Sequence, residues 1–198
     1  MDNNTEIWRH YYEKTLSHKH SPRTELASKL NESNFKVAID CGCGTGSDVF
    51  YLAQLGYQVY GFDINPDSIS ICRKRFGNDP LVEISQASFE NYDYPTCGLI
   101  VANSSLYFAE PTHFKKTWDS LTSSLVNGGV FAGDFMGMND SWAANYRSPT
   151  APLTKHQVLD LFAGFEIIRF HERDELGKTS IGKMKHWHTF SLVAEKCT

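Results

Sequence analysis

The chain has 198 residues, of which 41% are hydrophobic and 13% aromatic, so it has enough apolar side chain for a core and is not intrinsically disordered. Its length fits a single α/β domain over residues 1–198. The 19 Lys and Arg residues against 23 Asp and Glu give a formal charge of −4, and no basic block occurs, which argues against nucleic acid as a partner. No apolar run approaches the roughly 20 residues that cross a membrane, so we expect no membrane partner.

The cysteine spacing and the first residues both indicate the cellular compartment to expect for the protein. The opening MDNNTEIWRHYYEK lacks the basic and apolar regions of a signal peptide. Five cysteines show no spacing typical of a disulfide framework or a zinc ribbon: Cys41, Cys43, Cys72, Cys97 and Cys197. We therefore expect a cytoplasmic protein.

Strands and helices alternate after the polar opening of residues 1–34. The run 35–40 (FKVAID) ends in an acid and leads into glycines, which is typical of a buried parallel strand before a tight turn. Helical spacing follows over 47–55, then a strand over 58–63 and a helix from Pro66 to Phe76. Further strands are expected at 81–86, 98–103, 129–135, 165–172 and 186–196. Further helices are expected at 111–125 and from Thr154. We also expect an irregular stretch at 136–152 and a polar connection at 173–185.

This alternation predicts a doubly wound, Rossmann-like sheet of seven strands with helices on both faces, because each right-handed crossover lays its helix back on the sheet. Ligands of such sheets bind beyond the carboxyl ends of the strands. The functional candidates are therefore the loops after Asp40, Asp63, Gln86, Asn103 and Phe135.

The first of these loops carries the glycine pattern Gly42-x-Gly44-x-Gly46. Glycines let the backbone approach a ligand, and the helix behind them offers free N–H groups. Asp40 precedes the loop, and Asp63 ends the next strand about 20 residues on, where a carboxylate accepts hydrogen bonds from a ribose diol. Together these residues predict an adenosine site.

Glycine spacing and charge favour S-adenosylmethionine over a dinucleotide. A dinucleotide fingerprint is Gly-x-Gly-x-x-Gly, but Ser47 stands at its last position. S-adenosylmethionine carries a sulfonium and an ammonium and no phosphate, so Asp40 beside the loop favours it. An oxidoreductase that binds NAD and a non-catalytic sensor of S-adenosylmethionine stay open as alternatives.

Three segments resemble known motifs. VAIDCGCGTGSD and VYGFDINPDSI resemble the first two motifs of the class I S-adenosylmethionine-dependent methyltransferases, and ANSSLYF resembles their fourth-strand motif. Within that superfamily, W-x-x-Y-Y, the run that ends in VYGFDI and K-H-W-H-x-F resemble small bacterial methyltransferases of the tellurite-resistance type. The resemblance implies an antiparallel last strand, S-adenosylmethionine as cofactor and an N-terminal segment, residues 1–34, that folds over it as a lid. It also makes Trp8, Tyr11 and Tyr12 candidate lid residues.

The same resemblance assigns cofactor contacts. The methionyl part is expected beside Asp40, Gly42, Gly44 and Asn103, with Gly46 at the start of the helix. Asp63 is expected at the ribose and Ile64 at the adenine. The contact to the adenine amino group falls near Ala87, Ser88 and Phe89, with Glu90 as the alternative.

The methyl acceptor is expected at the same edge of the sheet. An antiparallel last strand begins there, and His186 and His188 share one of its faces because side chains alternate. A pocket with aromatic walls and a few polar groups suits a small molecule. The candidate bases are His186, His188 and Tyr107, and the candidate substrate residues are Asp134, Asp140, Trp142 and Glu172, with Arg147 at the rim. His-x-His also suits zinc, but no third ligand has a recognisable spacing, so we expect no metal.

Overall fold

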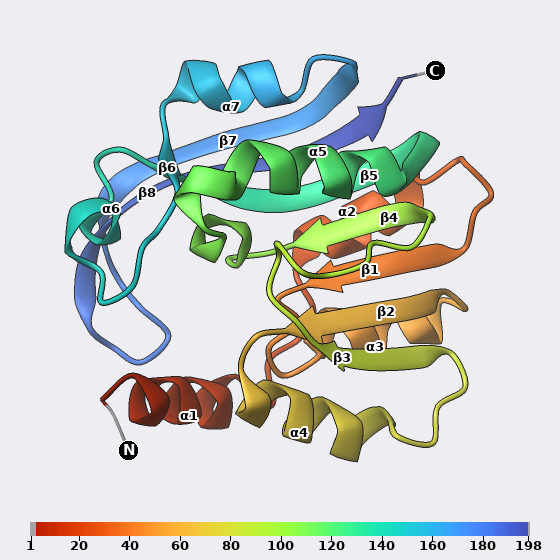
Figure 1. Ribbon diagram of the computed structural model, residues 1–198, viewed down its shortest axis with the longest axis horizontal. Helices are drawn as coiled ribbons and strands as arrows, with labels where there is room; N and C mark the ends of the chain where they lie inside the picture. The colour runs from red at the N-terminus through yellow and green to blue at the C-terminus, as the bar shows by residue number, and fades with distance from the viewer. Residues whose placement is uncertain (1–2, 198) are drawn as a thin grey trace.

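The computed structural model describes residues 3–197 (Figure 1). Its helices are α1 (Asn3–Thr15), α2 (Pro22–Leu30), α3 (Ser47–Gln54), α4 (Pro66–Phe76), η1 (Leu106–Phe108), η2 (Pro111–His113), α5 (Phe114–Ser124), α6 (Ser141–Asn145) and α7 (Lys155–Leu161). Its strands are β1 (Val37–Cys41), β2 (Gln58–Asp63), β3 (Val82–Gln86), β4 (Cys97–Ala102), β5 (Leu125–Gly137), β6 (Pro152–Leu153), β7 (Phe165–Lys178) and β8 (Met184–Lys196). None of the described helices is both long and apolar enough to cross a membrane.

The expected mixed sheet is confirmed. Its strands lie in the order β3-β2-β1-β4-β5-β8-β7, and the short β6 pairs with the end of β5. All neighbours from β3 to β5 are parallel, and β8 runs antiparallel to both β5 and β7. The chain leaves β1 toward β2 on one side and later returns to β4 on the other, so the switch point lies between β1 and β4.

Helices cover both faces of the sheet, and each face has its own apolar core. Alternation along β1 sends Ala38 to the face covered by α2, α3 and α4, and Ile39 to the face covered by α5 and α7. The core on the Ile39 face is rich in aromatic rings. The ring of Trp118 in α5 lies 5.1 Å from the ring of Phe131 and 5.1 Å from that of Phe162, between centroids. A sheet covered on both faces explains why β4 is buried at every position.

The last two strands are longer than the sequence analysis expects. We expected strands at 165–172 and 186–196 with a polar connection at 173–185, but pairing continues to the pair Lys178 and Met184. The prediction of a polar connection at 173–185 is therefore wrong. The charged residues of this segment lie in two paired antiparallel strands, and some of them contact residues of the opposite strand. Arg173, for example, lies over the ring of Trp187 at 5.1 Å. Likewise, the stretch expected to be irregular holds the end of β5, α6 and β6.

The carboxyl ends of the parallel strands meet at one edge of the sheet. Figure 1 shows that α1, α6 and the tip of the hairpin between β7 and β8 gather at this edge. Three segments that are far apart in the sequence thus surround the loops after β1 and β4, which is where the fold predicts a ligand.

Candidate active site

The glycine loop after β1 is built against the loop after β4. Gly42 has a φ of +73°, and a Cβ at this position would lie 2.5 Å from the Cβ of Ser105. The Oγ of Ser105 donates to the carbonyl of Cys41 at 2.5 Å. Gly44 differs, since with a φ of +53° its added Cβ would have only the Tyr12 ring nearby, at 3.9 Å. Gly42 therefore allows the two loops to pack, whereas Gly44 leaves open space.

Asp63 at the end of β2 organises this loop. Its Oδ2 accepts a hydrogen bond from the N–H of Gly44 at 3.0 Å, and its Oδ1 accepts one from the N–H of Asn65 at 2.9 Å. Burial raises the pKa of Asp63, and these two N–H groups oppose the shift because they stabilise the ionised form. An ionised carboxylate has about four lone-pair sites, so both oxygens keep capacity for a ribose diol.

A cavity of about 410 Å³ opens between the glycine loop, the ends of β2 and β3, and α1. Its size lies in the range of small-molecule and cofactor sites. The lining comprises Trp8, Tyr11, Tyr12, Gly42, Gly44, Phe62, Asp63, Ile64, Asn65, Ala87, Ser88, Phe89, Glu90, Asn103, Ser104, Ser105, Phe108, Glu110, Ser148 and Pro149. We refer to it as the glycine-loop cavity.

The residues present fit S-adenosylmethionine. Open space at Gly44 leaves room for the cofactor backbone, and Asp63 supplies the acceptors for a diol. Ile64 is 68% exposed although apolar, so its side chain is available to cover a flat base. The charged residues of the described lining are the three acids Asp63, Glu90 and Glu110, which suits a cationic cofactor.

Seven of the nine predicted cofactor residues line this cavity, and Asp40 and Gly46 do not. Asp40 is 4% exposed, and its burial and the nearby Asp48 raise its pKa well above the usual range. Gly46 caps the N-terminus of α3, as expected, and packs against Phe76 of α4. The sequence analysis missed Ser104 and Ser105, although both directly follow the fourth strand.

Asn103 and Asp134 belong to a buried polar network that holds α2 on the sheet. The amide of Asn103 donates to Asp48 at 3.0 Å and to Thr24 at 2.9 Å, and its oxygen accepts from Nε of Arg23 at 3.0 Å. Asp134, predicted at the substrate, instead forms an ion pair with Arg23. It also accepts from the N–H of Ser104 at 3.0 Å. Neither cavity wall includes Asp134.

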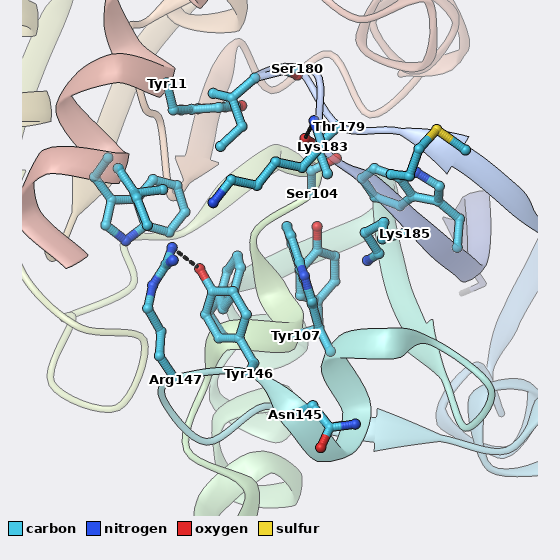
Figure 2. A pocket seen from close by; sticks show the side chains of 17 residues that line it. Tyr11, Ser104, Tyr107, Asn145, Tyr146, Arg147, Thr179, Ser180, Lys183 and Lys185 are labelled. Atoms are coloured by element: carbon cyan, nitrogen blue, oxygen red, sulfur yellow. Dashed lines mark hydrogen bonds between the residues drawn. The ribbon is translucent and has the colours of Figure 1, made fainter. Parts of the chain in front are cut away.

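A second cavity of about 330 Å³ lies between α1, α6 and the tip of the β7–β8 hairpin (Figure 2). We refer to it as the hairpin cavity. Its lining comprises Ile7, Trp8, Tyr11, Ser104, Tyr107, Phe108, Trp142, Asn145, Tyr146, Arg147, Thr179, Ser180, Ile181, Lys183, Met184, Lys185 and Trp187. Trp8, Tyr11, Ser104 and Phe108 also line the glycine-loop cavity, so the two cavities share one wall.

Lys185 of the hairpin cavity is held by one acid and two indole rings. Its Nζ lies 2.6 Å from Asp140, 3.7 Å from the centroid of the Trp142 ring and 4.0 Å from that of Trp187. Burial lowers the pKa of Lys185, and Asp140 opposes this shift. Asp140 also caps α6 through the N–H of Trp142 at 2.9 Å and accepts from the N–H of His188 at 3.0 Å. Asp140 thus fixes Lys185 and α6 together.

The two histidines lie on the other face of β8. Lys185 and Trp187 line the hairpin cavity, whereas neither cavity wall includes His186 or His188. Nδ1 of His188 accepts from the N–H of Asn139 at 3.0 Å, and its Nε2 lies 3.3 Å from Glu172. This corrects the placement expected for His186, His188 and Glu172 at the rim. The two histidines do share one face of β8, but Lys185 and Trp187 on the opposite face line the cavity, together with Met184 at the start of the strand.

Tyr107 and Trp142, the candidate base and a candidate substrate residue, line the hairpin cavity. Burial raises the pKa of Tyr107 well above its usual value, and Asp134 adds to the shift. Tyr107 therefore stays protonated at neutral pH and suits donation of a hydrogen bond rather than removal of a proton. Among residues 3–197, no group of three His, Cys, Asp or Glu side chains is arranged to hold a metal ion.

The sequence is similar to known methyltransferases. The family model of a methyltransferase domain matches residues 38–129, which include the glycine loop and Asp63. An uncharacterised methyltransferase of Bacillus subtilis, YodH, is 29% identical over 156 residues, which are 77% of this chain and 61% of YodH. The chain thus spans less than two thirds of that relative.

Solved structures show the same fold at low sequence identity. TehB from Haemophilus influenzae superposes with a TM-score of 0.71 at 16% identity, covering 91% of this chain and 63% of TehB. The N-methyltransferase NodS from Bradyrhizobium japonicum, in complex with S-adenosylhomocysteine, gives 0.67 at 14% identity over 98% of this chain and 99% of NodS. At these identities the likeness shows that the fold is shared.

Proposed function

We propose that this chain is a class I S-adenosylmethionine-dependent methyltransferase and transfers the methyl group to a small molecule in the hairpin cavity. The observation that carries the proposal is the shared wall of the two cavities. Trp8, Tyr11, Ser104 and Phe108 line both, so a cofactor in one and an acceptor in the other meet there.

Positioning is the main task of the chain in this reaction. When bound, S-adenosylmethionine supplies a methyl carbon that the acceptor's lone pair attacks in line while the carbon–sulfur bond breaks and its electron pair stays on sulfur. Asp63 and the Gly44 loop hold the adenosyl side, and the hairpin cavity orients the nucleophile. Holding both reactants in line makes the step effectively unimolecular, which is worth about 7–11 kcal/mol in well-oriented systems.

Helix α1 fits the role of a lid over the reacting atoms. Tyr12 is 3% exposed, and Trp8 lies 5.7 Å from the ring of Phe108 between centroids. Burial and the nearby Asp63 raise the pKa of Tyr11, so its hydroxyl stays protonated. In this proposal, α1 excludes water from both cavities and Tyr107 donates a hydrogen bond to the acceptor.

A methyl-transfer assay with labelled cofactor tests the proposal. The protein is incubated with trideuteromethyl-labelled S-adenosylmethionine and a small-molecule extract, and products are identified by mass spectrometry. We expect a labelled product of low mass together with an equal amount of S-adenosylhomocysteine. Cofactor binding without any labelled product would instead support a sensor, and label only in macromolecules would contradict a small-molecule acceptor.

A further inference from the structure

The two cavities carry opposite charges. The charged residues that line the glycine-loop cavity are Asp63, Glu90 and Glu110. Those that line the hairpin cavity are Arg147, Lys183 and Lys185, with no Asp or Glu in the described lining. Asp140 lies 2.6 Å from the Lys185 ammonium group and balances its charge, so the net positive charge comes from Arg147 and Lys183. The whole chain has a formal charge of −4, so a cationic cavity is not a reflection of overall composition.

Aromatic rings form most of the remaining wall of the hairpin cavity. Tyr146 lies 4.8 Å from Trp142 and 5.3 Å from Phe108 between ring centroids, and Trp142 lies 5.9 Å from Trp187. Rings at these distances, with tilts of 43–51°, make contiguous faces. Such faces favour a flat apolar ligand through offset stacking.

Lys185 is held in place before any ligand binds, and the backbone of Lys183 is fixed by the hairpin turn. Lys185 is fixed by Asp140 and by the two indole rings. Lys183 stands at the base of the hairpin turn, where its N–H donates to Oγ1 of Thr179 at 3.1 Å and its carbonyl accepts from the N–H of Thr179 at 2.8 Å. Figure 2 shows the Lys183 side chain extending across the cavity from this turn. Within the described chain, no carboxylate pairs with the Lys183 ammonium group.

We propose that the methyl acceptor is a planar aromatic acid, with its ring against Trp142 and Tyr146 and its anionic group toward Lys183. This inference rests on the proposed function, because it names the substrate class of the same site. The atom that receives the methyl group then lies toward Ser104 and Phe108, in the wall that faces the glycine-loop cavity.

The opposite charges of the two cavities also direct the cofactor and the acceptor to different cavities. A cationic cofactor is repelled by Lys183 and Arg147 of the hairpin cavity, and an anionic acceptor is repelled by the acids of the glycine-loop cavity. Each reactant therefore enters the cavity in which it reacts. A neutral or cationic aromatic acceptor would lose this discrimination and leave the Lys183 charge unpaired in the complex.

The test compares three ligands that share one ring. We would titrate 2-naphthoate, 2-naphthamide and 2-naphthylmethylammonium into the protein saturated with S-adenosylhomocysteine, by calorimetry. An ionised hydrogen bond is stronger than a neutral one, so we expect the acid to bind about tenfold more tightly than the amide, and the ammonium compound most weakly. Equal or tighter binding of the amide or the ammonium compound, or no binding of any of the three, would overturn the proposal.

Single substitutions test which side chain causes the preference for the acid over the amide. Lys183→Gln should weaken naphthoate binding about tenfold and leave naphthamide within about twofold, because only the acid uses the charge. Lys178→Gln is the matched control, since Lys178 is exposed on the same hairpin and is outside both cavity walls. Tyr146→Ala should weaken both ligands by a similar factor. Equal weakening of both ligands by Lys183→Gln would show that the ammonium group does not select the acid.

Two further titrations separate this inference from the proposed function. One measures the binding of S-adenosylhomocysteine itself, and the other repeats the three ligand titrations without it. Failure of S-adenosylhomocysteine to bind would contradict the proposed function, while the comparison of acid with amide would still test the hairpin cavity. Normal binding of S-adenosylhomocysteine with no preference for the acid would contradict only the proposed class of acceptor.

Discussion

Gly44→Ala should separate cofactor binding from folding. The added Cβ would face open space in the glycine-loop cavity, with the Tyr12 ring at 3.9 Å, so it fills room reserved for a ligand. The left-handed φ of +53° costs an L-residue about 1–2 kcal/mol. For a chain of this size that lowers the melting temperature by about 2–8 °C. Overpacking against the cofactor adds about 1–3 kcal/mol, which weakens S-adenosylhomocysteine binding roughly 5- to 150-fold.

Gly56→Ala is the matched control for this experiment. Gly56 has a φ of +78° and no heavy atom within 4 Å of its added Cβ, and it follows α3 away from both cavities. It should lose a similar amount of stability and keep the affinity for S-adenosylhomocysteine. Thermal unfolding and calorimetry on both variants give the comparison. Wild-type affinity in Gly44→Ala, or equal loss in both variants, would refute the argument that Gly44 makes room for the cofactor.

Three further predictions follow from single contacts. Because burial raises the pKa of Asp63, the affinity for S-adenosylhomocysteine should fall as the pH drops through that raised pKa, and Asp63→Asn should bind about 2 kcal/mol more weakly with a flat profile in the same calorimetry. Arg23→Met leaves Asp134 buried without its ion-pair partner and should lower the free energy of unfolding by about 2 kcal/mol in urea, less than for a fully buried pair, with partial recovery when Asp134→Asn is added. His188→Ala removes the acceptor of the Asn139 N–H and should destabilise the protein by about 1–3 kcal/mol without changing affinity for S-adenosylhomocysteine; a loss of affinity would contradict the placement of His188 outside the glycine-loop cavity.

The part of the site that depends on local sequence was predictable. The glycine loop and Asp63 follow buried strands whose apolar runs and terminal acids are visible in the sequence, and topology brings such strand ends to one edge. The helix that starts at Asn65 and Pro66 is confirmed with its cap, since Asn65 accepts from the N–H of Asp67 at 2.9 Å. The strand ends, the glycine loop and the helix cap are each marked by residues that are close together in the sequence.

The acceptor side depends on contacts that no local pattern reveals. His186 and Lys185 are adjacent, so the face of β8 that lines the cavity is decided by register, which pairs Leu176 with His186 across the hairpin. The charged residues of the hairpin have the sequence pattern of a polar connection, because the sequence does not show which residues lie opposite them in the paired strand. Asp134 pairs with a residue 111 positions away, Arg23, so its position at a strand end did not reveal its partner.

Parallel calorimetric titrations with S-adenosylmethionine, S-adenosylhomocysteine and NAD test the central claim most directly. An acidic cavity at the glycine loop, with open space at Gly44, predicts micromolar binding of the first two ligands and none of NAD, whose pyrophosphate is anionic. Binding of NAD without the other two would contradict the account of the site and favour an oxidoreductase.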